Sequence, residues 1–248
     1  MTGASSVREI FSPGELKSQL KWATNSIVAP YFQQLLQRAK YWADTKTRPS
    51  EAGLLPGMVC LLDWAGAHAL SDNALFLDCL NAELPAYCNP REKAHGMFHG
   101  LVATQLAMIA GLSGESLTPD CREAVYGRLG HDLNILVEER KDAPGKESAL
   151  AFCNNITAVV ASGILMSGYA LTSAGLRDAL PTDWLAIGQE TLQTYLNAYY
   201  HIDGSTLEGP NYFNFGTEHA LIAREALLAM TGMDALQWGT LERGRRFG

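Results

Sequence analysis

The chain is poor in charge, and poorer in basic than in acidic charge. Charged residues make up 18% of its 248 residues, and 19 lysines and arginines face 26 aspartates and glutamates, which gives a net charge of −7. A general nucleic-acid binder or a basic membrane-surface protein would carry the opposite balance, so we expect neither partner. The first fifty residues hold seven basic groups against three acidic ones. We therefore expect an anionic ligand only at a local basic patch.

Long hydrophobic segments are also missing. The longest uncharged apolar stretch, residues 156–171, has 16 residues and is interrupted by serine, threonine and glycine. It is short for a membrane span and typical of a buried helix. Residues 1–17 are polar and lack the apolar core of a signal peptide. The sequence predicts a protein outside the membrane, cytoplasmic as the chain stands, or periplasmic if a leader has been removed.

Cysteine is scarce and has no pairing pattern. The five cysteines, Cys60, Cys79, Cys88, Cys121 and Cys153, include no Cys-x-x-Cys pair and lie mostly in apolar surroundings. An odd number without paired spacing argues against a disulfide framework. We expect reduced, structural thiols, because a buried cysteine packs as a small hydrophobic residue.

Strand patterns are nearly absent, whereas a period of 3.6 residues recurs along the chain. This contrast predicts an all-α protein. Residues 16–44 are expected to form one or two amphipathic helices interrupted near Pro30. Residues 118–120 (Thr-Pro-Asp) predict a helix start, with threonine as the cap, and the helix should run to the cations at residues 140–141. Residues 182–183 (Thr-Asp) open a further helix.

Four segments share one pattern, being rich in small and apolar residues, nearly uncharged, and closed by a polar turn. They end at Leu70-Ser71, Leu112-Ser113, Leu171-Thr172 and Met230-Thr231, at spacings of 42, 59 and 59 residues. A helix that is apolar on all sides must be buried, and a more polar helix after each one would cover it. Such helix hairpins stack as a solenoid or close into a ring. We favour the ring, an (α/α) toroid formed as a single domain over residues 1–248.

Candidate functional side chains gather in two segments. Residues 201–212 form a long turn-rich connection that contains histidine, aspartate, glutamate and tyrosine. Such loops often carry function, although a capping connection explains the turn residues equally well. Asn154 and Asn155 stand before the apolar helix, where asparagine is a favoured cap. A cap needs only one of them.

These two segments resemble the heparinase II/III group of polysaccharide lyases, which includes oligoalginate lyases. The resemblance rests on the paired asparagines and on the string Asp-Gly-Ser-Thr-Leu-Glu-Gly-Pro-Asn-Tyr that ends at Tyr212, and it extends from about Asn154 to Met233. It implies an (α/α) toroid that cleaves a uronate-containing glycan, similar to heparan sulfate or alginate, by β-elimination. Members of the group carry a further β-sandwich domain with a catalytic histidine and often a zinc site. We accordingly expect no cofactor in this chain, and weak turnover by it alone.

The resemblance also implies roles for individual residues. In the group, an asparagine neutralises the substrate carboxylate, and a tyrosine donates a proton to the leaving oxygen and, with some substrates, also acts as the base. These roles fall to Asn154 or Asn155 and to Tyr212. The histidine that usually follows the asparagine is missing in either alignment. Since a free tyrosine has a pKa of about 10, a basic role near neutral pH requires a nearby cation or donor, for which His201 and Arg224 are candidates.

Other side chains are candidates for binding the substrate. His95 and His99 have the i,i+4 spacing of a metal pair on one helix face, but no third ligand is assignable, so we expect no metal and place both along the ring's cavity. Trp64 is the tryptophan best suited to stack on a sugar. Glu208 either contacts the substrate or orients a neighbouring basic or amide group. His201 is the remaining candidate for binding the substrate.

Two other function classes remain open. An inverting glycoside hydrolase on the same architecture would need two carboxylates about 6.5–9.5 Å apart, and Asp203 and Glu208 are the obvious pair. A non-catalytic domain that binds an acidic oligosaccharide is the other class. The leading hypothesis is the lyase, with an acidic polysaccharide as its partner.

Overall fold

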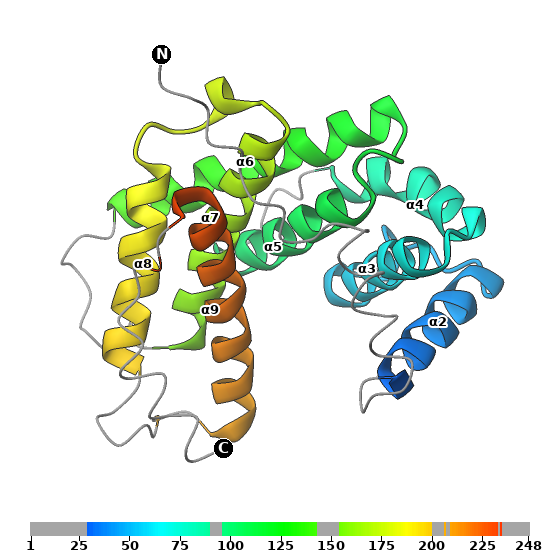
Figure 1. Ribbon diagram of the computed structural model, residues 1–248, viewed down its shortest axis with the longest axis horizontal. Helices are drawn as coiled ribbons and strands as arrows, with labels where there is room; N and C mark the ends of the chain where they lie inside the picture. Colours follow the sequence, from blue (N-terminus) through cyan, green and yellow to red (C-terminus); the bar gives the residue numbers. More distant parts are fainter. Residues whose placement is uncertain are drawn as a thin grey trace. The chain divides into compact units, whose positions relative to one another are not determined.

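The computed structural model describes residues 29–89, 96–142, 154–199, 206, 209–232 and 234 (Figure 1). Within these residues the protein is all-α, with eight α-helices, one short 3₁₀-helix and no strand. The all-α prediction is therefore confirmed over this part of the chain. The predictions that concern residues 16–28, His95, Cys153, His201, Asp203 and Glu208 lie outside the described residues.

Most helices begin and end where local sequence signals place them. Their bounds are α2 Ala29–Asp44, α3 Leu54–Ser71, α4 Ala74–Tyr87, α5 Gly96–Ser113, α6 Pro119–Asp142, α7 Asn155–Ser173, η2 Arg177–Ala179, α8 Trp184–Tyr199 and α9 Pro210–Thr231. Helix α6 begins at Pro119, and the Cys121 N–H donates to the Thr118 hydroxyl at 3.4 Å. Its last turn holds Arg140 and Lys141, as expected for cations near a helix C-terminus.

The four segments rich in small and apolar residues form α3, α5, α7 and α9, each followed in the sequence, where described, by a more polar helix. Helices α5 and α7 are long and apolar enough to cross a membrane by length and composition alone. Yet 83% of the apolar window of α7 is buried inside the protein, which is the pattern of a core helix. The expectation that residues 156–171 form a buried helix is confirmed.

The described helices form two compact units, which we treat separately. Unit 1 contains α5 up to Thr104, α6 from Leu129 onward, α7, α8 and α9. Unit 2 contains α2, α3 and α4, with α5 from Gln105 and α6 up to Arg128.

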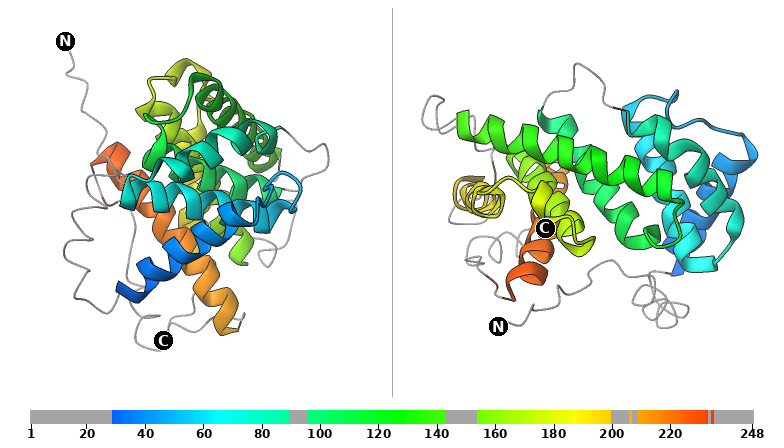
Figure 2. Two further views of the ribbon diagram at one scale, coloured as in Figure 1. Left: turned by 90° about the vertical axis from the view of Figure 1, so that its right-hand side faces the viewer. Right: turned by 90° about the horizontal axis from the view of Figure 1, so that it is seen from above.

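Helix α7 is the centre of unit 1 and packs against both α8 and α9. Helix α8 runs antiparallel to α7, because Trp184 at its start lies on Gly168 and Gly188, one turn later, lies on Ile164. Helices α7 and α9 stay side by side in the views of Figures 1 and 2 and run in the same direction. The beginnings of α7 and α9 and the end of α8 therefore share one end of unit 1.

Helix α5 crosses α7 at very short range. A Cβ on Gly100 would lie 2.7 Å from the Val159 carbonyl oxygen, and one on Gly163 would lie 2.6 Å from the Gly100 Cα. Beside this crossing, the hydroxyls of Thr104 and Ser162 are 2.8 Å apart. Glycine is required at both positions because backbone meets backbone there.

A buried carboxylate joins two helices of unit 2. Asp63 on α3, 3% exposed, accepts hydrogen bonds from Nε and Nη2 of Arg38 at 2.9 and 2.7 Å and from the Trp42 indole at 3.1 Å. These contacts join α2 to α3. Burial raises the pKa of the nearby Cys60 thiol to about 12, as expected of a structural thiol. Of the cysteines predicted to be reduced, Cys60, Cys79 and Cys121 carry free thiols in the described part of the chain.

The prediction that Trp64 stacks on a sugar is wrong for this structure. Trp64 is only 2% exposed, and its indole N–H donates to the Ala39 carbonyl at 3.1 Å. Because both ring faces are covered by protein, the side chain serves the core of unit 2. Sequence reasoning identified its helix as buried but could not tell which side chains of that helix face a neighbour.

Candidate functional site

The two asparagines at the start of α7 have different environments. Asn154 is the helix cap, with extended backbone (φ −113°, ψ 167°), and its side-chain oxygen accepts the Ile156 N–H at 3.1 Å. Asn155 is the first residue of the helix and is only 8% exposed. The capping interpretation is thus confirmed for Asn154, and Asn155 is the amide held inside the protein.

Helix α9 carries Tyr212 in its first turn. The helix begins at Pro210, whose fixed φ suits the first helical position. Tyr212 is 57% exposed, whereas Gly216, one turn later on the same face, is buried. A Cβ on Gly216 would lie 3.3 Å from the Cβ of Asn155. The face of α9 that carries Tyr212 is therefore the face that meets the start of α7.

The end of α8 completes this region. Tyr195 is fully buried, and its ring stacks on that of Tyr199 with centroids 4.6 Å apart and planes 24° from parallel. A Cβ on Gly216 would collide with the Tyr195 hydroxyl and would be 3.2 Å from the ring carbon that bears it. Asn155, Tyr195 and Gly216 therefore meet, and we call this three-residue contact the junction.

His219 is a further polar residue on the same face of α9. It lies seven residues after Tyr212, is 8% exposed, and its ring contacts that of Phe215 at 4.5 Å. Its Nδ1 is 2.9 Å from the Phe215 carbonyl oxygen, which places the hydrogen of the neutral ring on Nδ1 and leaves Nε2 as an acceptor. Burial lowers the pKa of His219, against the opposing effects of the Phe215 carbonyl and the Glu218 carboxylate.

Sequence reasoning missed His219 and Tyr195. The signal for His219 was available, because positions i, i+4 and i+7 of a helix share a face, and Tyr212, Gly216 and His219 have that spacing. No comparable signal existed for Tyr195. It reaches the junction from α8, whose packing on α7 and α9 is not encoded in local spacing.

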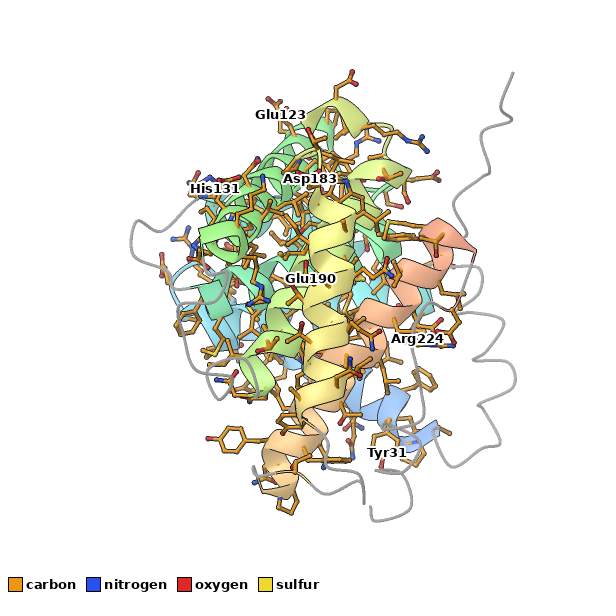
Figure 3. The ribbon with its side chains drawn as sticks, turned by 90° about the vertical axis from the view of Figure 1, so that its left-hand side faces the viewer. Tyr31, Glu123, His131, Asp183, Glu190 and Arg224 are labelled. Atoms are coloured by element: carbon orange, nitrogen blue, oxygen red, sulfur yellow. The ribbon has the colours of Figure 1, made fainter. Side chains whose placement is uncertain are left out.

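Arg224 does not lie beside Tyr212. It lies twelve residues further along α9, about 18 Å by helix rise, and Figure 3 shows it well away from the first turn. Its guanidinium pairs with Glu225 and Asp234, and the hydrogen bonds that it donates to Asp234 raise its own pKa. The expectation that Arg224 supports a tyrosine base is therefore wrong.

His99 lies in the first turn of α5 and is 5% exposed. Its Nδ1 is 2.7 Å from the carboxylate of Asp132, a fully buried residue of α6. This contact fixes the ring and joins α5 to α6 within unit 1. His131, the residue before Asp132 on α6, approaches the His99 ring edge-on, with ring centroids 6.1 Å apart, and is labelled in Figure 3.

Among the residues that the structure describes, no group of three histidine, cysteine, aspartate or glutamate side chains could hold a metal ion. The junction and its surroundings instead offer a buried amide, phenols and an imidazole. Such groups donate and accept hydrogen bonds and transfer protons. In comparisons with known proteins, no family model and no curated protein matches the chain.

Proposed function

We propose that the protein is a polysaccharide lyase that cleaves a uronate-containing glycan by β-elimination. One observation supports this most directly: the buried amide of Asn155 packs against α9 one turn after the exposed phenol of Tyr212. The reaction needs an amide and a phenol within reach of a single sugar residue. The resemblance in the same two segments supports the same residues.

The first chemical problem is removal of the proton at C5 of the uronate. Loss of this proton sends charge onto a carboxylate that is already negative, so donors must hold that carboxylate as the charge grows. We assign this role to Asn155, because it packs against α9 one turn from Tyr212, whereas the side chain of Asn154 caps α7. Asn155 also lies at a helix N-terminus, where the helix dipole favours a negative group.

The second problem is departure of the oxygen at C4. In the proposed step the C5–H bond breaks, its electron pair forms the C4=C5 double bond, and the C4–O bond breaks. The ionised oxygen of Tyr212 first takes the C5 proton. The phenol so formed then donates that proton to the leaving oxygen. The proton thus passes from C5 to the leaving oxygen, and no external acid is consumed.

The architecture that we propose for this chemistry is an (α/α) toroid. Apolar helices α3, α5, α7 and α9 would line the inside, and α4, α6 and α8 would cover them. The alternation of buried apolar helices with more polar ones supports this arrangement. The parallel course of α7 and α9, with α8 antiparallel, is also what adjacent hairpins of a toroid require.

The test compares matched asparagine variants on uronate oligosaccharides from heparan sulfate, alginate and hyaluronan. We expect Asn155→Ala to lower turnover about a hundredfold or more, as loss of one oxyanion donor does. Asn154→Ala should instead cost about 1 kcal/mol of stability, as loss of a cap does, and leave turnover nearly unchanged. The rate is read from the ultraviolet absorbance of the new C4=C5 bond.

A second variant separates binding from chemistry. Tyr212→Phe should abolish elimination while affinity for the oligosaccharide, measured by calorimetry, falls far less, because the hydroxyl is needed for proton transfer. New reducing ends without ultraviolet absorbance would show that the protein is a hydrolase and not a lyase. Binding without cleavage by the parent chain would replace it by a non-catalytic glycan-binding domain.

A further inference from the structure

Tyr195 occupies a special place in unit 1. It is fully buried near the end of α8, and its ring is held on one side by Tyr199. Its hydroxyl lies directly against the backbone of α9 at Gly216, in the space that any side chain at that position would fill. The phenol therefore acts as a spacer between α8 and α9.

The same contact sets the position of α9 against α7. The point at which a Gly216 Cβ would sit is 3.3 Å from the Asn155 Cβ, so Asn155 and the Tyr195 hydroxyl approach the same spot on α9. Tyr212 lies one turn earlier on this face of the helix. A shift of α9 at Gly216 therefore moves Tyr212 relative to Asn155.

We infer that Tyr195 is a positioning residue, whose hydroxyl fits into the gap left by Gly216 and holds the phenol of Tyr212 in register with the amide of Asn155. The inference rests on the proposed lyase function, and it assigns to Tyr195 no contact with the glycan. Misplacement of a reacting group by about 1 Å can cost a hundredfold in rate. The fit between one hydroxyl and one glycine is thus enough to control turnover.

A purely structural role for Tyr195 would depend on its ring and not on its hydroxyl. If the residue only fills the core, the stacked ring supplies the stability and the hydroxyl is dispensable. Tyr199, the other ring of the stack, is buried to a similar degree, at 3% exposed, and belongs to the same helix. It is therefore the matched control for loss of a buried hydroxyl from α8.

The experiment is a double-mutant cycle between Tyr195→Phe and Gly216→Ala, with kcat and KM for elimination and the melting temperature measured for each variant. Gly216→Ala should lower kcat about a hundredfold, since its methyl group displaces the hydroxyl and moves α9. Tyr195→Phe should lower kcat about tenfold, with KM within about threefold of the parent value. Tyr199→Phe should leave both constants within about twofold.

The double variant is the decisive one. Once the hydroxyl is absent, the alanine methyl meets the ring carbon at 3.2 Å, a clash that a shift of a few tenths of an ångström relieves. We therefore expect the double variant to regain about tenfold in kcat over Gly216→Ala alone, and to melt higher than that single variant. This comparison remains informative if Gly216→Ala folds poorly.

The outcomes separate the inference from the proposed function. A parent chain that yields no unsaturated product overturns the lyase and, with it, the role of Tyr195. A parent chain that does yield the product, with Tyr195→Phe no slower than Tyr199→Phe, overturns the inference alone. A double variant whose kcat is no higher than that of Gly216→Ala also overturns the inference alone.

Discussion

At the scale of single residues, burial separates side chains that the sequence presents as equivalent. Asn154 and Asn155 are the same residue type one position apart, yet one caps α7 from outside and the other is buried against α9. A helix turns by about 100° per residue, so adjacent side chains face different surroundings. The different surroundings of the two amides follow from this rotation.

His219 gives a prediction for the dependence of stability on pH. Burial lowers its pKa, so between that value and the ordinary value of about 6.5 the unfolded chain binds a proton that the folded protein does not. The contribution to stability is therefore complete above about pH 6.5 and is lost as the pH falls toward the folded pKa. His219→Asn keeps a donor for the Phe215 carbonyl and should flatten this loss in urea unfolding measured at several pH values.

Glu218→Gln should extend the pH dependence of stability that His219→Asn flattens. The Glu218 carboxylate raises the pKa of His219, so its removal lowers that pKa further and should extend the acid loss of stability to lower pH. If the free energy of unfolding depends on pH identically in all three proteins, His219 is not the group responsible.

At the scale of elements, the position of α7 depends on small residues where helices cross. The crossing of α5 and α7 brings Gly100 and Gly163 together, backbone against backbone, so neither helix can yield by rotating a side chain. Large apolar side chains elsewhere on α7 then fill the core around this contact. The small residues that interrupt the apolar stretch are therefore explained by packing.

Gly163→Ala should accordingly destabilise the protein. The new Cβ would lie 2.6 Å from the Gly100 Cα and 2.9 Å from a Leu136 methyl, and overpacking of this kind costs about 1–3 kcal/mol. Gly130→Ala on α6 is the control, because a Cβ there meets nothing within 4 Å and alanine is the better helix former. It should stabilise by about 0.5–1 kcal/mol. Equal effects in denaturant unfolding would contradict this account of the crossing.

At the scale of the whole molecule, the net charge of −7 opposes an acidic ligand. The groups that we assign to the site, the amide of Asn155 and the phenol of Tyr212, bind through neutral donors. At 0.1 M ionic strength, salt largely screens the repulsion between exposed charges that are more than about 10 Å apart. The net charge of the protein thus repels an acidic ligand, whereas the hydrogen-bond donors of the site attract it.

We therefore predict that added salt strengthens binding. Raising sodium chloride from low to physiological concentration should tighten the affinity for a uronate oligosaccharide by about two- to threefold, measured by calorimetry. A neutral oligosaccharide of the same length is the control and should show no such change. Affinity that weakens with salt would mean that basic side chains hold the glycan.

The sequence by itself determined the all-α class, the start of α6 at Pro119 and the ends of the apolar helices, because caps and helical periodicity act over a few neighbouring residues. It also reduced the candidate amides to two. Only the tertiary structure showed that Asn154 caps α7 while Asn155 is buried, placed Trp64 in the core and brought Tyr195 to Gly216. Those outcomes depend on which helix packs beside which, and contacts between distant segments leave no local pattern.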